Sequence, residues 1–80
     1  MSFEAIPSDY IMQLFDQGRR EKAAAALEFF FFSEYGRYLS TNKWAKRWSV
    51  SKSTSWQWCE DFKAEEERRY RASMARSRSL

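Results

Sequence analysis

Residues 40–62 read STNKWAKRWSVSKSTSWQWCEDF, and this stretch predicts two short helices joined by a sharp turn. The first helix is expected over residues 41–48, with Ser40 as its N-cap, because a serine hydroxyl can accept a hydrogen bond from a free amide of the first turn. The second helix is expected over residues 52–62, with Ser51 as its N-cap. The segment between the two helices is too short for a free loop, so the chain must turn sharply there.

Each of these helices has an apolar face. In the first helix, Trp44, Ala45 and Trp48 fall at i, i+1 and i+4. In the second, residues at i, i+3, i+4 and i+7 share the inward face: Ser55, Trp58, Cys59 and Phe62. The outward face carries Lys52, Ser53, Trp56, Gln57 and Glu60. A small alanine at the helix crossing, an apolar residue after the turn and a polar outward face are typical of a DNA-binding helix-turn-helix.

The sequence of residues 45–54, AKRWSVSKST, resembles that of the small helix-turn-helix proteins of phages and bacterial mobile elements. The resemblance covers about 23 of the 80 residues, and it departs from the family at two positions. The family usually has glycine in the turn, where positive φ is often required, and this chain has Ser49. A side chain in that conformation costs about 1 kcal/mol. The family also prefers valine or isoleucine where Ser55 stands.

The motif assigns roles to residues if the second helix lies in the major groove of DNA. Base-edge contacts are expected from residues near the start of that helix: Lys52, Ser53 and Gln57. Phosphate contacts are expected from Ser51 and Thr54, and backbone contacts from Lys43, Lys46 and Arg47 on the preceding helix. For the cations, the alternative is a solvated charged face. Trp56 has three open interpretations: a DNA contact, partial packing on the core, or a protein contact.

The charges of the chain are divided unevenly. Residues 1–39 carry four basic and six acidic side chains, whereas residues 40–80 carry ten basic and five acidic ones. A positive half that contains the motif favours a polyanionic partner, here double-stranded DNA. The alternative is a basic tail that only increases solubility.

The whole chain predicts one all-α domain, a small three- to four-helix bundle over residues 1–62 with a charged extension over residues 63–80. Ser8 is expected to cap a first helix that ends at Gly18. A second helix is expected over residues 19–35, with an inward stripe of Ala23, Ala26, Leu27, Phe30 and Phe31. In the extension, residues 63–71 predict a solvated helix, and residues 72–80 are expected to fray or be disordered.

Four consecutive phenylalanines, at positions 29–32, point around most of the second helix. An 80-residue monomer can hardly bury all four. Either they all pack in the core, or some of them, Phe29 and Phe32 in particular, form a homodimer or partner interface. Direct ligand binding is a third alternative.

Catalysis is not expected, because the chain has no histidine and no phosphate-cradling glycine-rich loop. A lone Cys59 predicts neither a disulfide nor a metal site, and no cofactor or small-molecule substrate is implied. The N-terminus has no signal-peptide pattern and no apolar run reaches the length of a membrane span, so a cytoplasmic location is expected.

The predicted function is therefore sequence-specific DNA binding, as a small phage or bacterial transcriptional regulator. Two alternatives remain. The chain could be an accessory DNA-binding protein of replication or transposition, or a protein-interaction module that uses the helix-turn-helix as a scaffold.

Overall fold

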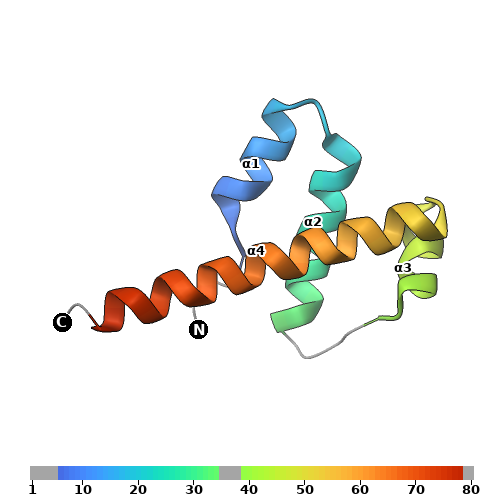
Figure 1. The fold of residues 1–80 in the computed structure, drawn as a ribbon. Coiled ribbons are helices and arrows are strands. Elements are labelled where there is room, and N and C mark those ends of the chain that lie inside the picture. The colour runs from blue at the N-terminus through green and yellow to red at the C-terminus, as the bar shows by residue number, and fades with distance from the viewer. Residues whose placement is uncertain (1–5, 35–38, 79–80) are drawn as a thin grey trace.

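The computed structural model describes residues 6–34 and 39–78, and within these ranges the chain forms four α-helices and no strand. The helices are α1 (Ser8–Asp16), α2 (Arg20–Glu34), α3 (Thr41–Trp48) and α4 (Lys52–Arg78). Figure 1 shows α1 and α2 as an antiparallel hairpin, α4 crossing α2, and α3 beside the N-terminal end of α4. The prediction of a small all-α bundle is confirmed.

The α1–α2 turn ends α1 as the sequence predicts, although α1 begins differently. Gly18 has a φ of 75°, its backbone nitrogen donates to the Phe15 carbonyl at 2.9 Å, and Arg19 donates to the Leu14 carbonyl at 2.9 Å. This pair of bonds is the Schellman motif. At the other end, the prediction that Ser8 caps α1 is wrong, because Pro7 occupies the cap position without a side-chain hydrogen bond.

The buried face of α2 differs from the predicted stripe. Ala23, Ala26 and Phe30 are buried as expected, but Leu27 and Phe31 are exposed. In their place, α2 buries Lys22, Ala25 and Phe29. The reason is that α2 packs against α1 and α4 together, so its buried arc is wide and is turned away from Leu27 and Phe31.

This arrangement corrects the expected partner surface at the phenylalanine run. Phe29 lies in the core, with its ring centroid 5.4 Å from Phe62 and 6.0 Å from Trp44, so a partner cannot use it. Phe32 is half-buried and packs on Trp44 at 5.4 Å between centroids. Of the four phenylalanines, Phe31 is the most exposed.

The second helix of the predicted helix-turn-helix, expected over residues 52–62, does not end near Phe62. It continues without interruption as α4 to Arg78, so residues 72–78, which were expected to fray, are helical. No glycine or proline follows Gly36 in the sequence, and Arg71 pairs with Glu67 at 2.7 Å in an i, i+4 contact. Residues 79 and 80 lie outside the described residues.

Candidate nucleic-acid interface

The turn between α3 and α4 has the same geometry as the turn at Gly18, but it is built on serine. Ser49 adopts a φ of 55° and a ψ of 46°. Its backbone nitrogen donates to the Lys46 carbonyl at 3.3 Å, and Val50 donates to the Ala45 carbonyl at 3.1 Å. The predicted positive φ at this position is therefore confirmed, and a Schellman motif ends α3.

Serine caps begin both helices of the motif, as the sequence predicts. The Ser40 hydroxyl accepts a hydrogen bond from the Lys43 amide at 3.3 Å. The Ser51 hydroxyl accepts one from the Thr54 amide at 3.2 Å, and it donates to the Thr54 hydroxyl at 2.9 Å. These local bonds satisfy free amides at the start of each helix. The conformation of residues 40–54 is therefore determined largely by contacts within this segment.

Packing then positions α4 against α3. Trp44 and Trp48 stack with centroids 4.5 Å apart, and Trp48 lies 5.8 Å from Trp58. Ser55 is fully buried at the crossing, where its hydroxyl donates to the Thr41 carbonyl at 2.9 Å. A small hydrogen-bonded residue at this position lets the two helices approach closely. It also explains why serine is tolerated where the resembling family prefers a larger aliphatic residue.

The opposite face of α4 is open to solvent. Lys52, Ser53, Trp56 and Gln57 are all exposed, and Trp56 keeps 54% of its surface accessible. Thr54 is half-buried and bonded to the capping serine. On α3, Lys43 and Lys46 are exposed as well. The chain thus brings the predicted base-reading residues together on one surface, flanked by two lysines of the preceding helix.

Arg47 departs from this group. Its guanidinium pairs with Glu28 of α2 and lies 5.0 Å from the centre of the Phe32 ring. It therefore links α3 to α2 while it stays exposed, and its contact with DNA alongside Lys43 and Lys46 remains a prediction. The sequence could not show this link, because Glu28 lies 19 residues away.

Positive charge predominates in the sequence that forms the exposed face. Residues 40–59 contain Lys43, Lys46, Arg47 and Lys52 and no acidic side chain. The nearest carboxylates in the sequence are Glu60 and Asp61. A local surplus of positive charge attracts phosphates and raises the rate of encounter with a polyanion.

The carboxylate of Asp61 is occupied by two neighbours. Lys22, which is only 5% exposed, donates to one of its oxygens at 2.7 Å, and the Gln57 amide donates to the other at 3.0 Å. Burial alone would raise the pKa of Asp61, but these hydrogen bonds outweigh it and lower the pKa. The Asp61 carboxylate therefore stays ionised at neutral pH, and its contact with Lys22 links α2 to α4. The sequence carries no local signal for this contact.

Cys59 behaves as a core residue. It is 4% exposed, and burial raises the pKa of its thiol, although the nearby Lys63 lowers it in part. The thiol is therefore protonated at neutral pH and packs as a small apolar side chain. Within the part of the chain that the structure describes, no cluster of side chains could hold a metal ion.

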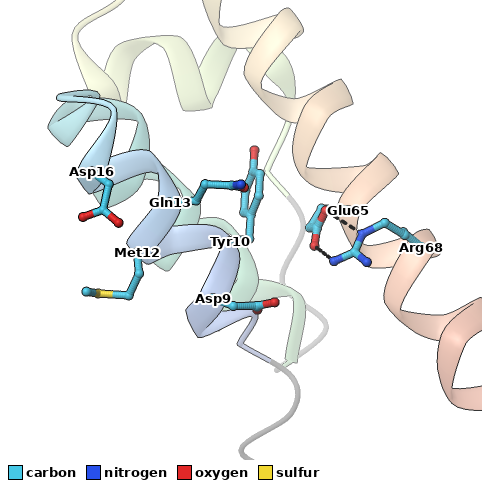
Figure 2. Close-up of a pocket in the computed structure, with 7 residues that line it drawn as sticks. All are labelled: Asp9, Tyr10, Met12, Gln13, Asp16, Glu65 and Arg68. Carbon is cyan, nitrogen blue, oxygen red and sulfur yellow. Dashed lines mark hydrogen bonds and ion pairs between the residues drawn. The ribbon is translucent and has the colours of Figure 1, made fainter.

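A groove of about 640 Å³ lies between α1 and α4. Figure 2 shows the residues that line it. Its lining is mainly polar and includes three carboxylates and one cation: Asp9, Tyr10, Met12, Gln13, Asp16, Glu65 and Arg68. Arg68 is paired with Glu65, with its Nε 3.1 Å from a carboxylate oxygen. Glu65 lies about 20 Å along α4 from Lys52, at 1.5 Å per residue. The lining has a net negative charge, which disfavours phosphates, and it is separate from the basic face.

The chain matches no family model, no curated protein and no solved structure. Among residues 6–34 and 39–78, no helix has the length and apolar character needed to cross a membrane.

Proposed function

We propose that this protein binds double-stranded DNA through α3 and α4, with the first turns of α4 in the major groove. The observation that carries the proposal is the division of α4 into two faces. Ser55, Cys59 and Phe62 are buried against the bundle, while Lys52, Ser53 and Gln57 are exposed on the other side. A helix that presents polar residues beside a basic surface has the arrangement needed to read base edges.

Each exposed side chain has a role that its chemistry allows. Gln57 can pair with both hydrogen-bonding groups of adenine, and Lys52 can reach the acceptors of guanine. Reading adenine would require the Gln57 amide to leave Asp61, which it now contacts at 3.0 Å. Trp56 would pack on sugar edges or thymine methyl groups. Lys43 and Lys46 would contact phosphates and set the register of the protein on DNA.

Within this function, we favour a small phage or bacterial transcriptional regulator that recognises a defined sequence. The exposed polar residues at the start of α4 support sequence-specific contacts, since phosphate contacts alone carry no sequence information. An accessory role in replication or transposition would use the same surface. The position of the preferred DNA site, at a promoter or at a replication or recombination site, separates these roles.

The test is fluorescence anisotropy with labelled duplex DNA at several salt concentrations. The logarithm of the binding constant should fall with the logarithm of salt concentration, with a slope of about 0.9 per phosphate engaged. The double variant Lys52→Ala/Gln57→Ala should weaken binding by about tenfold or more, since each good base contact contributes about 1–3 kcal/mol. No binding at about 50 mM salt would contradict the proposal.

The matched control is the double variant Arg19→Ala/Gln13→Ala. It removes the same kinds of side chain, one cation and one glutamine, from exposed positions in and after α1. It should leave the affinity for DNA unchanged within about twofold. An equal loss in both double variants would show that net charge, and not the face of α4, determines binding.

A further inference from the structure

Four exposed residues share one face of α2. Arg20, Ala24, Leu27 and Phe31 fall at i, i+4, i+7 and i+11, which is the alternating spacing of a coiled-coil seam. Leu27 is 42% exposed and Phe31 is 46% exposed. The buried arc of α2 lies on the opposite side of the helix, so these positions lie outside the core, although the Phe31 ring is 6.0 Å from that of Phe32 in its own chain.

We propose that a second copy of this chain packs antiparallel on this face of α2. A twofold axis near the boundary between Ala25 and Ala26 places Ala24 of one copy opposite Leu27 of the other. The same axis places Arg20 opposite Phe31. Each contact then occurs twice, as a twofold interface requires.

The pairing is complementary in size and in chemistry. A leucine opposite an alanine fills the space that the small side chain leaves, so the two helices can interdigitate. An arginine over a phenylalanine ring makes a cation–π contact. The chain already uses this contact internally, where Arg47 lies 5.0 Å from the centre of the Phe32 ring.

A parallel pair would lack this complementarity. It would place Arg20 beside Arg20, with like charges together, and Ala24 beside Ala24, with a gap between the helices. A different protein would need its own matching pattern, whereas the second copy supplies it from the same four residues. Self-complementarity is therefore the reason for choosing a second copy as the occupant.

The rim of the face carries two carboxylates, Glu21 and Glu28. In the antiparallel register, Glu21 of one copy lies near Glu28 of the other, and like charges there would oppose pairing. Glu28 is already paired with Arg47 in its own chain, which offsets this repulsion. The rim therefore permits association without adding much to it.

The face is short, about 16 Å along the helix at 1.5 Å per residue. It buries less than the roughly 1,200 Å² of a stable interface, so the dimer should be weak and reversible. None of the four residues belongs to α3 or α4, and the proposal does not depend on DNA binding.

The proposal is tested by sedimentation equilibrium of the full chain without DNA. The variants exchange the sizes of the two residues that face each other, Ala24 and Leu27. Ala24→Leu places leucine against leucine and should weaken dimerisation about tenfold, a difference of about 1.4 kcal/mol. Leu27→Ala leaves a gap and should weaken it similarly. The double variant Ala24→Leu/Leu27→Ala restores one small and one large residue per pair, and it should recover most of the wild-type association.

Two results would overturn the proposal. A wild-type chain that stays monomeric up to about 1 mM would leave the face to some other partner, because 1 mM corresponds to only about 4 kcal/mol of binding. Tighter association of Ala24→Leu would indicate unspecific hydrophobic contact without this register. As a control, Met12→Glu changes an apolar residue of α1 that is 59% exposed, and it should leave association unchanged. Circular dichroism confirms that each variant is folded.

Discussion

The two halves of α4 belong to one continuous helix but relate differently to the rest of the chain. Residues 52–62 bury Ser55, Cys59 and Phe62 in the bundle. In residues 63–75, Tyr70 and Met74 are 66% and 42% exposed. Figure 1 shows the C-terminal end of α4 extending beyond the other helices. The same secondary structure therefore has two causes, tertiary packing in the first half and local side-chain pairs in the second.

Polar contacts join the second half of α4 to the bundle. Ser33 of α2 donates to Glu66 at 2.7 Å, and Arg69 lies 3.4 Å from Asp9 of α1. Within the helix, the pair of Arg71 with Glu67 at 2.7 Å is largely exposed and contributes about 0.3–0.5 kcal/mol. Stability should consequently be concentrated in the first half, and the following predictions test that difference.

The largest effect is expected at Phe62. It is fully buried, and its ring contacts Phe29, Phe30 and Trp48 at centroid distances of 5.4–6.0 Å. Phe62→Ala should lower the free energy of unfolding by about 3–5 kcal/mol, measured by urea denaturation. Phe62→Leu provides a milder change if the alanine variant does not fold. Met74→Ala, in the second half, should change stability by less than about 0.5 kcal/mol, and equal effects would contradict the comparison.

The next largest loss of stability is expected when the ion pair of the first half, Lys22–Asp61, is broken. Breaking an exposed pair of the second half should have a smaller effect. Asp61→Asn leaves the Lys22 ammonium buried without its charge partner, which should destabilise the fold by about 2 kcal/mol. This is less than for a fully buried pair, because the Asp61 side chain is one-third exposed. In a Lys22→Met background the same substitution should cost much less. Glu67→Gln, which breaks an exposed pair of the second half, should cost less than about 0.5 kcal/mol.

The Lys22–Asp61 pair also predicts a pH dependence. The pKa of Asp61 is lowered in the folded protein, so its contribution to stability is present at neutral pH and is lost as the pH falls through that lowered value. Urea denaturation at several acidic pH values should show a smaller loss of stability in Asp61→Asn than in the wild type. An identical pH dependence would exclude a role for this carboxylate.

An effect of similar size is expected at the crossing of α3 and α4. Ser55→Val inserts a larger side chain into a fully buried position and removes the hydrogen bond to the Thr41 carbonyl. It should destabilise the fold by about 1–3 kcal/mol, although valine is the residue that the resembling family prefers. Ser55→Ala removes only the hydrogen bond and should cost about 1 kcal/mol. Stabilisation by valine would show that the crossing has space to spare.

The smallest changes in stability are expected at two turns, the one at Ser49 that leads into α4 and the one at Gly18. Ser49 and Gly18 both have positive φ, 55° and 75°, but only glycine adopts this conformation without strain. Ser49→Gly should stabilise the protein by up to about 1 kcal/mol in thermal denaturation. Gly18→Ala should destabilise it by about the same amount, through backbone strain alone, since no atom lies within 4 Å of the added Cβ. A change of the same sign in both variants would refute the shared geometry of the turns.

Most of the candidate interface could be predicted because its signals are local. The bounds of α3, the caps at Ser40 and Ser51, and the exposed start of α4 depend on residues within four positions of one another. Arg47 is the exception, because its position depends on Glu28 and Phe32 of another helix. The groove between α1 and α4 was also beyond prediction, since its lining joins residues 9–16 to residues 65 and 68.

The sequence by itself determined that this chain is helical, where most of its helices stop, and which face of residues 52–62 is buried. Hydrogen bonds and helix periodicity act between near neighbours, so a short stretch contains that information. Only the tertiary structure decided that Phe29 and not Phe31 enters the core, that Lys22 is buried against Asp61, and how α4 sits on the bundle. Burial depends on which helices approach each other, and that choice involves residues far apart in the chain.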